Sequence, residues 1–194
     1  MATSTTRTNK PILPRGNDQS PLAFNRAKLY SGKALDFDGV NDYVDLDGFT
    51  LSGTSATFSF AFNSDDLSVL RYFFDASDTR FIIGSGNTAN YLTLYTPTSS
   101  FQDIVEVQTG EWYKLDISIN GTSAACYLNG QLVNTLTIGE IDLSAATLAK
   151  FGSARNGAGL FYNGEASNFK IFNTALTAAQ VADLYNNPEK VVPT

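Results

Sequence analysis

Five aspartates fall within twelve positions of one short stretch, GKALDFDGVNDYVDLD, which covers residues 32–47. Hard cations such as Ca2+ bind several converging carboxylate or carbonyl oxygens. Asp36, Asp38 and Asp42 offer such oxygens, so a calcium site on these three residues is one prediction. The stretch lacks the ligand spacing and the sixth-position glycine of an EF-hand loop. The alternative is that the aspartates hydrogen-bond the backbone of a turn.

A second pair of acids stands in GEIDLSAAT, where Glu140 and Asp142 are two residues apart. Side chains at i and i+2 of a strand share a face, and a retaining glycoside hydrolase needs two carboxyl groups about 5 Å apart. No third carboxylate follows within reach, and the segment resembles a connection between strands. A glycoside hydrolase is therefore the remote alternative, and we expect the protein not to be an enzyme.

Residue types that the sequence lacks exclude other chemistry. There is no histidine, which excludes His-based triads and His-ligated zinc, and a single cysteine allows no intrachain disulfide. That cysteine, Cys126, stands in a strand-like run, where we expect a buried hydrophobic residue rather than a nucleophile. No apolar run is long enough to predict a membrane span, and MATSTTRTNK lacks the apolar core of a secretion signal.

Aromatic residues on strand-like runs and beside a glycine-rich segment suggest carbohydrate binding. Exposed aromatic rings stack on the faces of sugar rings, and nearby polar groups hydrogen-bond the hydroxyls. The candidate carbohydrate-binding residues are Tyr91, Tyr95, Arg155, Asn156, Phe161 and Tyr162. The alternative for each aromatic residue is packing in the core.

Charge is distributed unevenly along the chain. Residues 1–33 carry a net charge of +5 and residues 34–194 carry −11, within a total of −6. The acidic part argues against nucleic-acid binding, whereas the basic part fits an acidic partner. Residues 1–30 are rich in Thr, Ser, Asn and Pro without a hydrophobic period, so we expect an extended arm that anchors the protein. The candidate anchoring residues are Arg7, Lys10, Arg15, Arg26 and Lys28.

The rest of the chain is patterned as short strands. Its low charge and 15 glycines are typical of an all-β domain. WYKLDISI (112–119) alternates apolar and polar residues, which predicts a half-buried strand. Asn120-Gly121 and Asn129-Gly130 each predict a type I′ turn, and together they indicate a three-strand meander.

Two further elements are predicted at the ends of this patterned region. Alternation across residues 34–46 indicates two short strands joined by a turn at Gly39 to Asp42; the inward residues are then Leu35, Phe37, Val44 and Leu46. Near the C-terminus, Thr177 and Gln180 form the capping box of a helix that ends at Asn187-Pro188. Its apolar stripe consists of Val181, Leu184 and Tyr185.

Four stretches in order resemble one family. They are GKALDFDGVNDYVDL, ATFSFAFN, GEWYKLDISINGTSAACYLNGQLV and LAKFGSARNGAGLFYNGEASNFKIFNTALTAAQVADLYNN. Together they resemble the laminin-G-like, concanavalin A-like jelly-roll superfamily. The resemblance implies an all-β, two-sheet antiparallel jelly-roll sandwich with one short C-terminal helix. We therefore expect an arm at residues 1–30, a jelly-roll domain at 31–188 and a tail at 189–194.

The resemblance leaves the function open, because members of this superfamily include lectins, adhesion modules, glycosidases and structural domains. The leading hypothesis is a non-enzymatic virion protein of the capsid-decoration, head-fibre or tail-fibre type, made in the host cytoplasm without a secretion signal. It rests on elimination: a short chain from Met1 without a signal or disulfide, and an arm of opposite charge to the body. Its expected partners are other virion proteins and cell-surface glycans, and a homotrimer is plausible. The alternative is a stand-alone carbohydrate-binding module or lectin from a bacterial protein.

Overall fold

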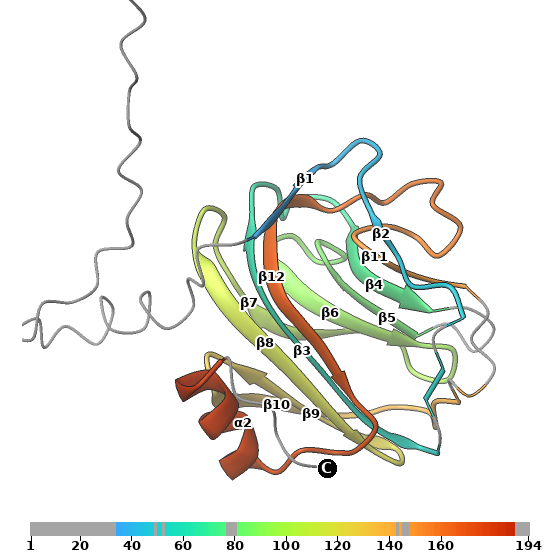
Figure 1. Cartoon of the computed structure of the whole chain (residues 1–194), viewed down its shortest axis with the longest axis vertical. Coiled ribbons are helices and arrows are strands. Elements are labelled where there is room, and N and C mark those ends of the chain that lie inside the picture. The colour runs from blue at the N-terminus through green and yellow to red at the C-terminus, as the bar shows by residue number, and fades with distance from the viewer. Residues whose placement is uncertain are drawn as a thin grey trace, which may run out of the picture.

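The computed structural model describes residues 34–48, 50–51, 53–76, 81–142, 144 and 148–188. These residues form a sandwich of two antiparallel six-stranded sheets, and one helix is present among them (Figure 1). The prediction of an all-β jelly roll with a short C-terminal helix is confirmed. The predictions for the basic arm and for the tail lie outside the described residues. No helix in the described part of the chain is long and apolar enough to cross a membrane.

Each sheet interleaves strands that are distant in the sequence. In spatial order, the first sheet contains β1 (Leu35–Asp38), β12 (Asn163–Phe172), β3 (Ser55–Ser64), β8 (Trp112–Asn120), β9 (Ser123–Leu128) and β10 (Gln131–Thr137). The second sheet contains β2 (Val44–Asp45), β11 (Ala149–Phe151), β4 (Arg71–Ala76), β5 (Phe81–Ser85), β6 (Tyr91–Thr96) and β7 (Ser100–Glu106).

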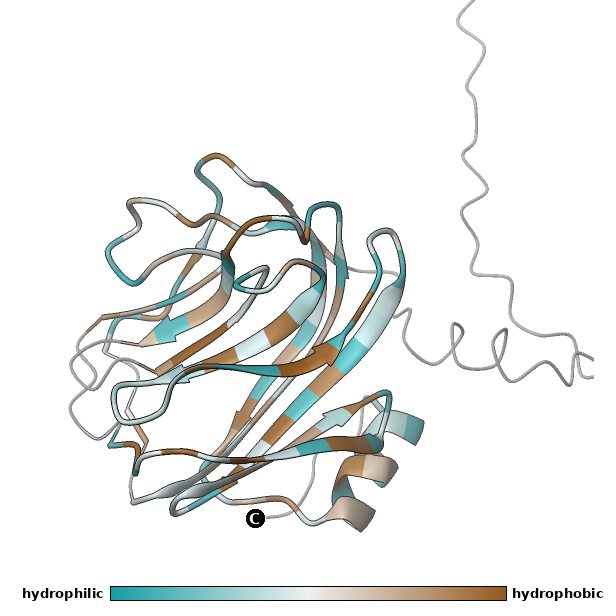
Figure 2. Cartoon of the chain, turned by 180° about the vertical axis from the view of Figure 1, so that it is seen from behind, coloured by the Kyte–Doolittle hydropathy of each residue, from teal (hydrophilic) through white to brown (hydrophobic). Residues whose placement is uncertain are grey.

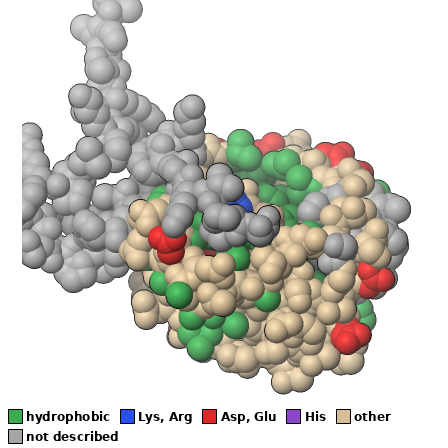
Figure 3. Space-filling view, turned by 60° about the horizontal axis from the view of Figure 1, so that its bottom comes forward, with side chains coloured by type: hydrophobic (Ala, Val, Ile, Leu, Met, Phe, Trp, Pro, Cys, Tyr) green, Lys and Arg blue, Asp and Glu red, His purple; other side chains and the backbone are tan. Residues whose placement is uncertain are grey.

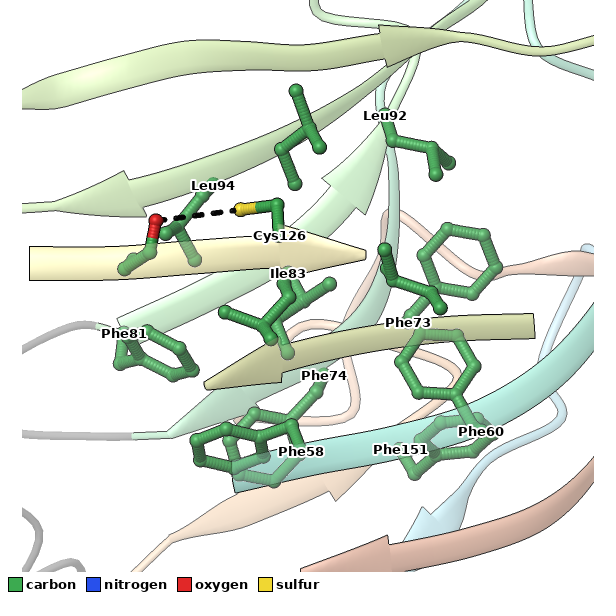
Figure 4. Close-up of a cluster of buried hydrophobic side chains, with 14 of the residues drawn as sticks. Phe58, Phe60, Phe73, Phe74, Phe81, Ile83, Leu92, Leu94, Cys126 and Phe151 are labelled. Atoms are coloured by element: carbon green, nitrogen blue, oxygen red, sulfur yellow. Dashed lines mark hydrogen bonds between the residues drawn. The ribbon is translucent and has the colours of Figure 1, made fainter. Parts of the chain in front are cut away.

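The core lies between the sheets and is rich in phenylalanine (Figure 4). Apolar and polar bands alternate along many of the strands (Figure 2), because successive side chains of a strand point to opposite faces. Phe58 stacks on Phe81 with ring centroids 4.9 Å apart, and the Phe60 ring meets the Phe151 ring edge-on at 5.4 Å. Cys126 is fully buried among these residues, as predicted, and burial raises the pKa of its thiol to about 12.

The meander of β8, β9 and β10 is antiparallel as predicted, but its two turns differ. Asn129 and Gly130 both have positive φ (52° and 77°), as a type I′ turn requires. In the first turn Asn120 still pairs with Ser123, so the central residues are Gly121 and Thr122, and of these only Gly121 has positive φ. That pattern is typical of type II′, so the predicted register of this turn was wrong by one residue.

The helix α2 (Ala178–Asn186) begins as predicted, with Thr177 and Gln180 forming a reciprocal capping box. The segment before it is fastened to the outer face of the first sheet. Thr57 Oγ1 donates to the carbonyl of Thr174, and Ser118 Oγ donates to that of Leu176, both at 2.8 Å. The helix packs Val181, Leu184 and Tyr185 against this face.

Cover by this segment and helix accounts for a difference from the sequence-based expectation. Alternation in WYKLDISI predicted one exposed face, yet Lys114 and Asp116 on that face are 2% and 0% exposed. They form a buried ion pair, and Lys114 Nζ also donates to Ser59 Oγ at 2.8 Å. Desolvation lowers the pKa of Lys114 and raises the pKa of Asp116.

The acidic stretch does not form a hairpin, because its two strands join different sheets. β1 pairs with β12 at the edge of the first sheet, and β2 pairs with β11 at the edge of the second. Gly39, with φ of +73°, turns the chain from one sheet to the other. Phe37 enters the core as predicted, whereas Leu35 is 56% exposed, which contradicts its predicted inward position.

The two flanks of the sandwich are closed differently. On one flank β7 and β10 are tied by side chains: Asn134 Nδ2 donates to the carbonyls of Asp103 and Ile104, and Gln102 Nε2 donates to that of Thr137 at 2.9 Å. On the opposite flank lie the short strands β1 and β2. We call the side formed by β1, β12, β2 and β11 the open flank (Figure 1).

Candidate functional site

The outer face of the second sheet gathers aromatic and charged side chains in register. Directly paired residues of antiparallel strands project to the same face. One such row crosses all six strands and contains Asp45, Lys150, Asp75, Ile82, Tyr95 and Phe101. The neighbouring row contains Tyr72, Gly84, Thr93 and Asp103.

The aromatic end of this face is built by β6 and β7. Tyr91 and Tyr95 alternate with the buried Leu92 and Leu94, so both tyrosines point away from the core. Both remain partly exposed, and the Tyr95 ring lies 4.8 Å from that of Phe101. Partly exposed rings on a rigid strand are suited to stack against the apolar face of a sugar.

Polar groups lie between these rings. Thr93, between Tyr91 and Tyr95 on β6, is fully buried and donates through Oγ1 to the carbonyl of Gln102 at 3.1 Å. Its cross-strand partner Asp103 has a buried Oδ1 without a hydrogen-bond partner among the described residues. A buried carboxylate oxygen without a donor is costly, so this oxygen is an acceptor that the described residues leave unsatisfied.

At the other end, Arg155 lies on the same face through Asp75. The Asp75 side chain is 1% exposed; its Oδ2 accepts the backbone N–H of Arg155 at 3.0 Å and lies 3.5 Å from Arg155 Nη1. The predicted residue Asn156 holds the loop instead, because its Oδ1 accepts the backbone N–H of Ala158 at 3.1 Å.

The last two candidate aromatic residues lie elsewhere. Phe161 is partly buried, and its carbonyl accepts a hydrogen bond from Arg71 Nη1 at 2.9 Å. Tyr162 is fully buried, and its hydroxyl donates to the carbonyl of Asn63 at 2.8 Å. Burial raises the pKa of Tyr162 well above its usual range. Its ring therefore has no exposed face on which a sugar could stack. The glycine-rich sequence around Tyr162 did not indicate that this residue is buried.

Two of the aspartates proposed for calcium hold the turn between β1 and β2. Asp38 Oδ1 accepts the backbone N–H groups of Val40 and Asn41, which lower the pKa of Asp38. Asp42 Oδ2 accepts the backbone N–H of Asp38 at 3.1 Å. Asp36 is exposed on the edge strand β1.

The other two aspartates of the stretch share a protein cation. Lys150 Nζ lies 2.9 Å from Asp45 Oδ1 and 2.7 Å from Asp47 Oδ1, and it is 5.7 Å from the centre of the Tyr43 ring. Asp47 Oδ1 also accepts the backbone N–H of Ala149. An ammonium group thus occupies the point where these two carboxylates converge.

The donor set of the stretch does not fit calcium. Among the described residues, no group of three or more His, Cys, Asp or Glu side chains is arranged to hold a metal ion. The oxygens of Asp38 and Asp42 are directed at backbone N–H groups, as in a turn. The geometry therefore favours the turn-forming alternative for this stretch.

The acids of the hydrolase alternative are not arranged as a catalytic pair. Glu140 and Asp142 lie in a connection after β10, as expected, and not on a strand. Asp142 Oδ1 accepts from the backbone N–H and the hydroxyl of Ser144, and these bonds lower the pKa of Asp142. Both side chains are exposed in this loop, and that of Asp142 is engaged by Ser144.

The sequence did not predict some residues of the outer face. Phe101, Asp103 and Asp75 became part of it only through cross-strand register. The sequence SFQDIVE does not alternate regularly, because β7 has one extra residue where its pairing shifts: Val105 pairs with Leu92, and Asp103 pairs with Thr93. Lys150 likewise belongs to this face because it lies beside Asp45 in space, and its neighbours in the sequence do not indicate this.

Comparisons with known proteins identify this architecture. A family model described as the Concanavalin A-like lectin/glucanases superfamily matches residues 38–182. A search of curated protein sequences found no match.

Solved structures share the fold at low sequence identity. A heptameric SAP-like pentraxin from Limulus polyphemus is 21% identical with a TM-score of 0.63, over 77% of this chain and 80% of that one. Domain 4 of the extracellular arabinanase AbnA from Geobacillus stearothermophilus, in complex with arabinotriose, is 21% identical with a TM-score of 0.56, over 78% and 71%. The CBM40 of the Ruminococcus gnavus IT-sialidase, bound to alpha2,3 sialyllactose, is 10% identical with a TM-score of 0.59, over 79% and 98%.

Proposed function

This chain belongs to the Concanavalin A-like lectin/glucanases superfamily, and from that premise we propose that it is a non-enzymatic glycan-binding protein. The sugar is held on the outer face of the second sheet. The observation that carries the proposal is the pair Tyr91 and Tyr95, partly exposed on one face of β6, with the unpartnered Asp103 oxygen between β6 and β7. Two similar structures, the arabinanase domain and the CBM40, were solved with bound oligosaccharides.

Each group has a role in the proposed complex. The rings of Tyr91 and Tyr95 stack on the apolar faces of successive sugar units, and Asp103 accepts a hydrogen bond from a hydroxyl. Arg155, held by Asp75, supplies a donor at the other end of the face. No residue is required to transfer a proton or attack a bond.

The test is a glycan array with wild-type protein and the variant Tyr91→Ala/Tyr95→Ala, in the presence of calcium and of a chelator. We expect binding by the wild type and loss of at least about tenfold in affinity in the variant, since an exposed stacking contact contributes on the order of 1 kcal/mol. Leu132→Ala, an exposed residue on β10 of the other sheet, is the matched control. Equal binding by the variant and the wild type would overturn the assignment of this face.

The proposal extends to where the protein works. We infer that the body is carried on a virion as a decoration, head-fibre or tail-fibre protein and that its basic arm, residues 1–30, anchors it to an acidic partner. The support is the opposite charge of the two parts, +5 and −11. On the face seen in Figure 3, Asp and Glu side chains lie around the margin of the body. A full-length variant with Arg7, Lys10 and Arg15 changed to Gln should dissociate from the particle; continued association would refute the anchor.

A further inference from the structure

The open flank contains an apolar cavity that the proposed function does not use. Its volume is about 280 Å3, and it lies where the edges of the two sheets approach each other. Its lining residues include Leu35, Val44, Phe151, Ala166 and Phe169. An apolar cavity of roughly 150 Å3 holds one benzene-sized group, so this one has room for two large side chains.

The strands around this cavity are incompletely paired. β12 runs from Asn163 to Phe172, but β1 pairs only with residues 163–166 of it. The part of β12 that borders the cavity therefore has no neighbouring strand of the described chain on that side. Leu35, the residue nearest to this gap on β1, is 56% exposed although it shares the strand face of the buried Phe37.

A second observation concerns charge beside the cavity. Asp36 and Glu165 are directly opposite each other on β1 and β12, and both are exposed. Like charges in this position are destabilising unless a cation lies near them. Neither carboxylate has a cationic partner among the described residues. Among the described residues, the Asp36–Glu165 pair thus lacks a positive charge, and the cavity beside it lacks an apolar cover.

We propose that residues 24–33 of the same chain dock on the open flank, with Leu29 and Tyr30 in the cavity. This segment, FNRAKLYSGK, is both apolar and basic, and it carries three positive charges and no negative one. It ends at Ala34, which itself lines the cavity. Leu29 is five residues upstream of Ala34, and five extended residues reach roughly 17 Å, more than the cavity requires.

The point where the segment joins the domain, at Ala34, favours this segment over a free ligand as the occupant of the cavity. A segment tethered directly at the rim has a high effective concentration, on the order of millimolar for a short tether. Its cations Arg26, Lys28 and Lys33 complement Asp36 and Glu165, so docking weakens as ionic strength rises. The distal cations Arg7, Lys10 and Arg15 stay available for the anchoring partner, and the outer face of the second sheet is untouched.

Hydrogen exchange of full-length protein tests this docking. Wild type is compared with Leu29→Asp/Tyr30→Asp and with the control Ile12→Asp/Leu13→Asp, which places the same charges farther from Ala34. We expect amides of residues 167–172 to exchange at least about tenfold faster in the first variant and unchanged in the control. Unchanged exchange in both variants would overturn the proposal.

Two additional measurements make the result specific. Leu35→Asp should speed exchange of the same amides, and combining it with Leu29→Asp/Tyr30→Asp should add little more, since both disrupt one contact. Additive effects would mean separate contacts and would count against docking. Protection that grows with protein concentration would assign the cavity to the segment of a second copy and would refute the intramolecular form.

Discussion

Lys150 shows how a single residue determines the behaviour of an acidic run. Its ammonium group is nearly buried between two carboxylates that are 61% and 37% exposed. The sequence revealed the cluster of aspartates but not the cation, because Lys150 is more than one hundred residues away from Asp45. The calcium prediction concerned Asp36, Asp38 and Asp42, of which Asp38 and Asp42 accept backbone N–H groups. Lys150 pairs with the other two acids of the stretch, Asp45 and Asp47.

Replacing Lys150 with Met should lower the melting temperature by about 2–8 °C at neutral pH, since two carboxylates then repel each other without a counter-ion. The difference from wild type should be largest at pH 7 and shrink below about pH 4. Hydrogen bonding from the Asp47 N–H, and then from Lys150, lowers the pKa of Asp45. A depressed pKa stabilises the fold above the unfolded value and loses that effect as pH falls through the folded value.

Thermal melts between pH 3 and pH 7 measure this effect, with Asp36→Asn as the control because Asp36 is exposed and unpaired among the described residues. A difference between wild type and Lys150→Met that stays constant over this range would contradict the ion-pair explanation.

At the scale of elements, the helix and the segment before it cover the outer face of β8, so that residues 114–119 are buried on both faces. The alternating pattern of β8 correctly predicted which residues share a face, and the capping box correctly predicted where α2 begins. The burial of Lys114 and Asp116 was not predictable, because it depends on cover by a segment that follows some sixty residues later. Local patterns determine strands and caps, whereas cover and cross-strand register arise from long-range packing.

The Lys114→Met variant should therefore be destabilised by about 3–5 kcal/mol, because it leaves the carboxylate of Asp116 buried without a counter-ion. The double variant Lys114→Met/Asp116→Leu should recover most of this loss, since no buried charge remains. Urea denaturation measures both, with Gln131→Ala on the exposed edge of β10 as the control. A single variant within about 1 kcal/mol of wild type would show that the pair is not buried as described.

At the scale of the whole molecule, several aspartates of the acidic body are paired with protein cations, although residues 34–194 keep a net charge of −11. Lys150 holds two aspartates, Arg155 approaches Asp75, and Arg71 pairs with Asp66 at 3.2 Å. The same guanidinium bonds the carbonyls of Gly39 and Phe161, so it joins three loops at one end of the sandwich. Four aspartates, Asp45, Asp47, Asp66 and Asp75, are thus held by protein cations.

The melting temperature should therefore be the same, within about 1 °C, in excess calcium and in excess chelator. A ligand that binds the folded state at one hundred times its Kd adds about 2.7 kcal/mol of stability, which a melt of a protein of this size detects readily. Differential scanning calorimetry makes the measurement, with Asp38→Asn as the second sample. A calcium-dependent increase that Asp38→Asn abolishes would restore the calcium site of Asp36, Asp38 and Asp42.

The brevity of β1 has a mechanical consequence. Only the four residues Leu35–Asp38 pair with β12, and the chain enters this strand at its Leu35 end. If the protein is held by its N-terminal part while the opposite part binds a surface, tension reaches the Leu35–Ala166 pair before the other pairs of β1. The pull then peels the strand one pair at a time, and does not shear all four together. Under load, β1 would yield while the long strands of the core still carry none of the force.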